Sequence, residues 1–171
     1  MKIKLLITSL LLACATAFPL DGLYLGAQLG HVALTGKASP LYSNTIGFAV
    51  DLGFRTNAIL DVLFSSQYSS HMGLGNGVSV YAETIGANFH VLEANDFDLS
   101  LGGGPGFYFF KYALKTETIF GLNTSANIDV KVTEHVRIGL GLRYHIVFTK
   151  DQDIGDNLWT VMMRMGYLFG E

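Results

Sequence analysis

Apolar residues alternate with small or polar residues in eight separate segments of this 171-residue chain. In the segment at about 136–148, Leu140 and Leu142 are separated by Gly141. A repeat of two places successive side chains on opposite faces of a β-strand, so each segment predicts a strand with one apolar face. The predicted strands lie at about residues 22–34, 43–55, 57–69, 77–91, 97–111, 117–132, 136–148 and 157–169.

The connections between these segments alternate in length. Longer, polar links near 35–42, 70–76, 112–116 and 149–156 alternate with tighter links near 56, 92–96 and 133–135. An antiparallel meander sends alternate connections to opposite ends, and long loops at one end with short turns at the other are typical of a membrane barrel. The sequence therefore predicts an all-β fold: a single antiparallel, up-and-down, eight-stranded transmembrane β-barrel.

Two segments depart from the simple pattern. Glu83 falls on the apolar face of the segment at 77–91, so either a β-bulge shifts the register there or Glu83 lies near the membrane rim. Pro105 lies in the middle of the segment at 97–111, although proline cannot donate a hydrogen bond to a strand ladder.

The apolar face could point outward to lipid or inward, as in a soluble secreted barrel. Charged residues make up only 15% of the chain, against about 25% in ordinary globular domains, which fits either a soluble protein with a buried core or a membrane barrel. The opposite face is mostly Gly, Ala, Ser, Asn and Thr, whereas a water-facing surface is normally rich in Lys and Glu. The composition of that face favours lipid, with the soluble barrel as the alternative.

Charged residues of both signs lie on the face that would line the lumen. An eight-stranded barrel is just wide enough inside for side chains to fill it, so these charges are expected to pair across the lumen as a plug. The alternative is that they line a pore. The predicted lumenal polar network consists of Asp51, Asp61, Asp129, Lys131, Arg143, His145 and Arg164.

Aromatic residues gather near the ends of the apolar faces. Trp159 and Tyr167 are eight residues apart on one face, which corresponds to roughly 20 Å along the membrane normal for a tilted strand. That spacing fits two interfacial girdles. The predicted interfacial aromatic residues are Phe54, Phe148, Trp159, Tyr167 and Phe169.

The N-terminus has the layout of a secretory signal peptide. A basic start with Lys2 and Lys4 precedes an apolar stretch and the small-x-small site Ala15-Thr16-Ala17. We therefore expect residues 1–17 to be a cleaved signal peptide and residues 18–171 to be the barrel domain. In the alternative, Leu11-Leu12-Ala13-Cys14 acts as a lipobox and Cys14 becomes lipidated.

The charge balance argues against a nucleic-acid partner. The chain has 11 basic and 14 acidic residues, and removal of Lys2 and Lys4 would leave 9 basic residues against the same 14. A protein that binds nucleic acid usually neutralises phosphates with an excess of Lys and Arg.

The last predicted strand ends in Arg164-Met165-Gly166-Tyr167-Leu168-Phe169, and other segments begin Gly22-Leu23-Tyr24-Leu25-Gly26 or contain Gly139-Leu140-Gly141-Leu142-Arg143-Tyr144. With these features the predicted mature chain resembles the eight-stranded outer-membrane barrels of OmpA/OmpX type. The resemblance implies an outer-membrane location in a Gram-negative-type bacterium and contact with membrane lipid and lipopolysaccharide. It also implies recognition of the C-terminal strand by the barrel-assembly machinery, and a monomer.

Motifs that could carry chemistry are weak. Gly102-Gly103-Gly104-Pro105-Gly106 lacks the Lys-Ser/Thr of a phosphate-binding loop. Ser69-Ser70-His71 places hydroxyls beside an imidazole, but neighbouring residues rarely have the geometry of a catalytic pair. The spacing of the five histidines fits no metal site. We therefore predict no catalytic, cofactor or metal residues.

The function expected from the sequence is that of a non-enzymatic outer-membrane barrel with exposed loops, acting in adhesion, surface interaction or envelope integrity. A narrow channel for small or apolar solutes is the second interpretation. A lipid-modifying barrel enzyme is the third.

Overall fold

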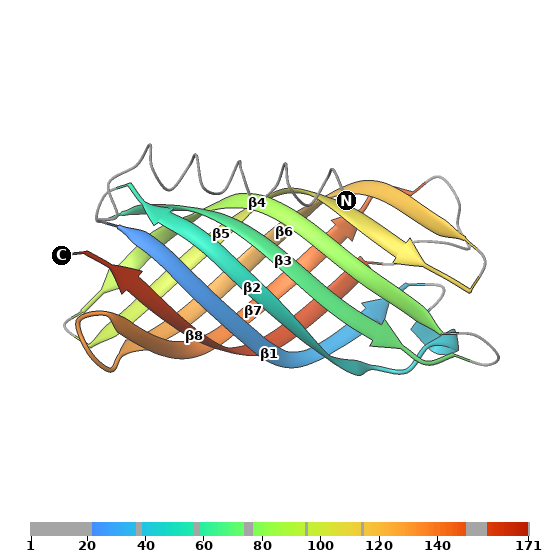
Figure 1. Cartoon of the computed structure of the whole chain (residues 1–171), viewed down its shortest axis with the longest axis horizontal. Helices are drawn as coiled ribbons and strands as arrows, with labels where there is room; N and C mark the ends of the chain where they lie inside the picture. Colours follow the sequence, from blue (N-terminus) through green and yellow to red (C-terminus); the bar gives the residue numbers. More distant parts are fainter. Residues whose placement is uncertain are drawn as a thin grey trace, which may run out of the picture.

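The computed structural model describes residues 22–36, 39–56, 59–73, 77–94, 96–113, 115–149 and 157–170. Within these ranges the chain forms one short 3₁₀ helix, Ser39–Leu41, and strands tilted against the long axis of a barrel (Figure 1). The strands are β1 Leu23–Thr35, β2 Thr45–Arg55, β3 Leu60–His71, β4 Val78–Glu93, β5 Phe97–Lys111, β6 Thr116–Lys131, β7 Val136–Val147 and β8 Asn157–Phe169.

Each strand pairs antiparallel with the next in sequence, and β8 pairs with β1 to close the barrel. The closing pair is extensive, with register from Leu23 opposite Phe169 to Thr35 opposite Asn157. Closure leaves the sheet without a free edge, which allows strands to pair their backbone donors and acceptors with neighbouring strands where water is absent. The predicted eight-stranded, up-and-down barrel is confirmed.

The two irregular segments are accommodated in different ways. The β4–β5 register is continuous at Glu83, which lies opposite Phe107, and the register shift occurs lower down, between His90 and Leu92. The pairing therefore excludes a β-bulge at Glu83, and its position near the membrane rim stays a prediction. Pro105 remains inside β5 and lies opposite Leu122 of β6, but it is absent from the ladder with β4, as expected for a residue without an N–H.

The apolar faces of the strands point outward. Large exposed apolar side chains occur on every strand around the barrel, whereas the opposite faces are mostly buried. Leu140 and Leu142 are each about half exposed, at 55% and 50%, although they lie in the middle of β7. An apolar belt of this extent on a closed barrel is the surface that suits lipid, and it excludes the soluble arrangement with the apolar face inside.

In the part of the chain that the structure describes, no helix is long and apolar enough to cross a membrane. The predicted signal peptide, with Cys14 and the cleavage site after Ala17, lies outside the described residues.

Candidate functional site

The lumen of the barrel has two chemically different halves. The half nearer the longer loops is filled by apolar side chains, among which Tyr108, Phe110 and Leu158 are at most 1% exposed. The predicted composition of the inner face, mostly Gly, Ala, Ser, Asn and Thr, does not describe this half. The buried apolar cluster comprises Val32, Leu34, Ala49, Val78, Val80, Ala82, Tyr108, Phe110, Val147, Leu158 and Met162.

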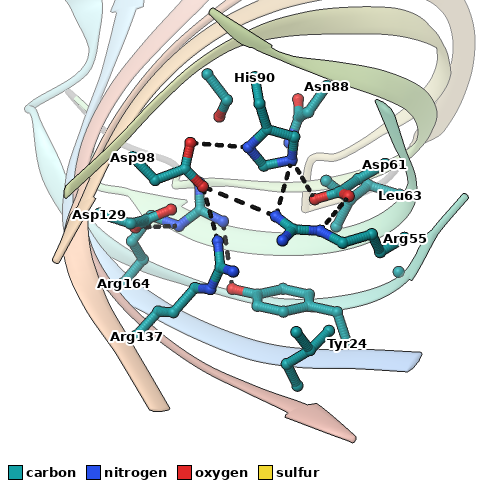
Figure 2. Close-up of a pocket in the computed structure, with 13 residues that line it drawn as sticks. Tyr24, Arg55, Asp61, Leu63, Asn88, His90, Asp98, Asp129, Arg137 and Arg164 are labelled. Atoms are coloured by element: carbon teal, nitrogen blue, oxygen red, sulfur yellow. Dashed lines mark hydrogen bonds and ion pairs between the residues drawn. The ribbon is translucent and has the colours of Figure 1, made fainter. Parts of the chain in front are cut away.

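The half nearer the short turns contains an ion-pair network centred on Asp98 (Figure 2). Asp98 is 1% exposed and lies on β5. Its Oδ1 is 2.8 Å from Nδ1 of His90, and its Oδ2 accepts a 2.7 Å hydrogen bond from Nη1 of Arg137. Because β4 and β7 supply these partners, the network ties strands together across the lumen.

Arg55 connects the same network to β2 and β3. Its Nε donates to Oδ1 of Asp61 over 3.1 Å, and its Nη2 lies 3.8 Å from Oδ2 of Asp98. His90 also contacts Asp61, with 2.8 Å between Nε2 and Oδ2. Figure 2 shows the imidazole of His90 between the two carboxylates, with Arg55 beside it.

The network reaches water at its outer edge. Lys131 Nζ lies 2.7 Å from Oε1 of Glu93, and both side chains are about a quarter exposed. Arg55 and Arg137 also approach this carboxylate, at 3.8 and 4.0 Å. The solvent exposure of the charged side chains therefore falls from Lys131 and Glu93 at the rim to Asp98 in the interior.

A second group lies beside this network, between β1, β6 and β8. Nε of Arg164 is 3.3 Å from Oδ1 of Asp129, and its Nη2 donates to the hydroxyl of Tyr24 over 3.2 Å. The ring of Tyr24 occupies space that glycine leaves free, since a Cβ at Gly26 or Gly166 would clash with it. These two glycines permit a large aromatic ring inside a narrow barrel.

The middle of the lumen is crossed by Arg143 of β7. Its Nη1 donates to Oγ of Ser65 on β3 over 2.8 Å, and its Nη2 lies 3.9 Å from Oδ1 of Asp51. Oδ2 of Asp51 accepts a hydrogen bond from Nε2 of Gln28 on β1. This level lies between the ionic and apolar halves and is more sparsely paired than the Asp98 network.

His145 lies one level nearer the loops than Arg143 and is fully buried. Its Nδ1 is 2.9 Å from the hydroxyl of Tyr108, and the two rings meet edge to face with centroids 5.5 Å apart. This contact joins the polar level to the apolar half of the lumen.

Every residue of the predicted lumenal network is on the inner face, but the seven do not form one cluster. The structure adds partners that were not among the predicted residues, namely Tyr24, Arg55, His90, Glu93, Asp98 and Arg137. The alternation in β5 could have identified Asp98 as a lumenal residue, because Asp98 lies on the same face of the strand as Ser100. The partner of each charge could not be read from one strand alone.

Free space inside the lumen is small. A cavity lined by Tyr24, Arg55 and Arg164 has a volume of about 20 Å³, measured as the space that the centre of a water molecule can occupy. A second cavity, beside Ser65 and Arg143, is of similar size. Each is enough for about one water, so the described side chains fill the barrel.

The histidine and serine residues at 69–71 are arranged differently from the expectation. Ser70 is exposed on the outer face, whereas Ser69 and His71 point inward and are at most 1% exposed. Ser69 Oγ is 3.0 Å from Nε2 of His71, and Nδ1 of His71 is 3.0 Å from the carbonyl oxygen of Ser43. The pair has catalytic-like spacing, but both groups are sealed from solvent and join β3 to the segment before β2.

Among the described residues, no group of three or more potential ligands could hold a metal ion. The predicted interfacial aromatics lie near the two ends of the outer wall. Phe54 and Phe169 flank Leu23 at the turn end, and Phe169 packs against Tyr167 with ring centroids 4.7 Å apart. At the loop end, Trp159 packs against His31, and Phe148 packs against Phe120.

Several solved outer-membrane proteins resemble this barrel. Neisserial surface protein A superposes with a TM-score of 0.78 at 15% identity, covering 87% of this chain and 98% of that one. OprG from Pseudomonas aeruginosa gives 0.60 at 13% identity, over 88% and 97% of the two chains. Ail, the attachment invasion locus protein of Yersinia pestis, gives 0.54 at 18% identity, over 86% and 98%.

No protein-family model matches the chain. No curated protein matches it in sequence either. The similarity is therefore one of fold, and together with the apolar outer wall it defines the class: an eight-stranded β-barrel of the outer-membrane type.

Proposed function

We propose that this protein is a non-enzymatic, non-conducting barrel of a Gram-negative-type outer membrane whose exposed end interacts with other molecules at the cell surface. The observation that carries the proposal is the filled lumen. An apolar core closes the half near the loops, and an ion-pair network closes the half near the turns. The two lumenal cavities between the described residues have room for about one water each, so we assign function to the outer wall and the loops.

The orientation follows from the connections. In bacterial outer-membrane barrels the short turns face the periplasm and the longer loops face outward. The three longest links, those after β1, β3 and β7, lie at one end of the barrel, and the links after β2, β4 and β6, of three or four residues, lie at the other end, where β1 begins and β8 ends. The loops after β1, β3, β5 and β7 therefore face the cell exterior in this proposal.

The names of the similar structures support a surface role without specifying it. One is a surface protein, another is an attachment and invasion protein, and a structure of the latter was solved with the heparin analogue sucrose octasulfate. Cleavage after Ala17, recognition of the C-terminal strand by the barrel-assembly machinery, and a monomeric state are further parts of the proposal.

Planar-bilayer recording tests the sealed lumen. We expect the purified, refolded protein to give no stepwise conductance above that of protein-free bilayers, because ions would have to cross the layer of Tyr108, Phe110 and Leu158. As the control, the same preparation must show the heat-modifiable gel mobility of a folded barrel. Reproducible unitary conductance from folded protein would contradict the proposal and favour the channel interpretation.

A further inference from the structure

The outer wall of β3, β4 and β5 is polar at the loop end instead of apolar. In the strand register, Ser70, Ser79 and Lys111 lie side by side on the outward face, with Ser79 opposite both of the others. The next outward level toward the turns contains Tyr68, Tyr81 and Phe109. The level below that contains Ser66, Glu83 and Phe107.

The hydroxyl groups of this wall form a connected surface. Ser79 Oγ is 3.4 Å from Oγ of Ser70 and 3.5 Å from the hydroxyl of Tyr68. Tyr68 also packs against Tyr81, with ring centroids 4.7 Å apart. Lys111 at the edge of this surface is exposed.

Glu83 is the unusual member, because its side chain points to the lipid side of the barrel. It accepts a 2.8 Å hydrogen bond from Ser66 Oγ, which satisfies part of one carboxylate oxygen. The next outward level toward the turns is apolar, with Phe64 opposite Ile85. A carboxylate at the edge of hydrocarbon is unfavourable unless it accepts hydrogen bonds. The other acceptor positions of the Glu83 carboxylate can be satisfied by donors from a bound molecule.

We propose that this outer-wall patch, formed by Ser66, Tyr68, Ser70, Ser79, Glu83 and Lys111, binds the headgroup of a phosphorylated glycolipid in the outer leaflet. The ammonium of Lys111 pairs with a phosphate, and the serine and tyrosine hydroxyls bond to the sugar. Glu83 accepts hydrogen bonds from sugar hydroxyl or amide groups. The acyl chains lie against the apolar level of Phe64 and Ile85. This inference rests on the proposed orientation, with the loop end facing outward.

The separation of the charges favours a glycolipid over a glycerophospholipid. Lys111 is level with Ser79, and Glu83 is four residues further along β4, which is about 13 Å of strand. A headgroup of more than one sugar ring can reach both charges. A single phosphate that contacts Lys111 cannot also supply hydrogen-bond donors to Glu83.

Binding can be measured by native mass spectrometry of the refolded barrel titrated with rough-type lipopolysaccharide and, separately, with phosphatidylglycerol. We expect Lys111→Met and Glu83→Gln each to weaken lipopolysaccharide binding by about tenfold, the usual size of one charge-assisted contact. Phosphatidylglycerol can reach Lys111 but not Glu83, so its binding should stay within about twofold of wild type in Glu83→Gln. The matched controls are Lys115→Met and Glu117→Gln, which remove an ion pair of the same charges at the same end of the barrel.

A readout without glycolipid separates this role from a structural one. In phosphatidylcholine bilayers, Glu83→Gln should raise resistance to urea, because it removes a charge from the lipid face. Unchanged lipopolysaccharide binding in both variants would overturn the proposal, as would equal losses in the controls or, for Glu83→Gln, equal losses for both lipids. A stable dimer that excludes lipid would overturn it in favour of a second copy. Each variant must retain heat-modifiable mobility, so that a failure here is distinct from a failure of the barrel or of the sealed lumen.

Discussion

Leu142→Arg is expected to destabilise the barrel in a bilayer by about 2–4 kcal/mol, the cost of arginine on a barrel's lipid face at midplane. Leu142 lies near the middle of β7, opposite Ala126 and Val161 of the neighbouring strands, and half of its surface is exposed. The guanidinium would have to enter hydrocarbon or thin the bilayer locally. The free energy of unfolding can be followed by urea titration in vesicles, with gel mobility as the measure of folded protein.

Two variants serve as controls for this prediction. Leu142→Ala removes the same leucine without adding charge, so it reports the loss of apolar area alone. Gly141→Ser changes the adjacent inward position, where a Cβ would lie 3.0 Å from Oδ1 of Asn127, so a small side chain needs only a slight adjustment. We expect both to cost clearly less than the arginine. Equal stability of Leu142→Arg and Leu142→Ala would mean that this face does not meet lipid.

Asp98→Asn is the second substitution with a large expected effect. It keeps the shape of the side chain but leaves Arg137 and Arg55 without the carboxylate that both approach, at 2.7 and 3.8 Å. Removal of one partner from a buried ion pair costs about 3–5 kcal/mol, because the remaining charge stays desolvated. The same urea titration should show this loss as a lower midpoint with an unchanged slope.

Glu93→Gln is the matched control for Asp98→Asn. Glu93 contacts Lys131 and approaches the same two arginines, but its side chain is 29% exposed. Water can replace its contacts, so we expect a cost of about 0–1 kcal/mol. If the two substitutions were equally mild, the Asp98 network would be hydrated and the lower lumen would not be sealed.

Local alternation was enough to predict the strands and their inner and outer faces. A period of two fixes which side chains share a face, and lipid contact is compatible with only one assignment of those faces. Pro105 and Glu83 were identified as irregular from the sequence alone. Whether each broke the strand depended on the neighbouring strands, because the pairing of Pro105 with Leu122 and of Glu83 with Ser66 is a property of the register.

The composition of the lumen was less predictable. Gly104, Gly106, Tyr108 and Phe110 follow one another at every second position of β5. The same inner face therefore carries small residues in one part of the strand and large apolar residues in the next. Only closure of the barrel shows that Leu158 and Met162 from β8 join Tyr108 and Phe110 in one core. Likewise, Asp98, His90 and Arg137 come from three strands, and their meeting depends on the width and stagger of the barrel.

The most direct test of the account is the environment of two neighbouring positions, Leu142 and Arg143. Single cysteines at 142 and 143, in a Cys14→Ser background, would be tested in barrels reconstituted into bilayers. The cysteine at 142 would carry a fluorophore, and the cysteine at 143 would be exposed to a membrane-impermeant thiol reagent. We expect a lipid-phase quencher to reduce the signal at 142 and the cysteine at 143 to stay unmodified, because Arg143 points inward to Ser65 and Asp51. An unquenched fluorophore at 142, or rapid modification of both positions by the membrane-impermeant reagent, would contradict the assignment of the outer wall to lipid.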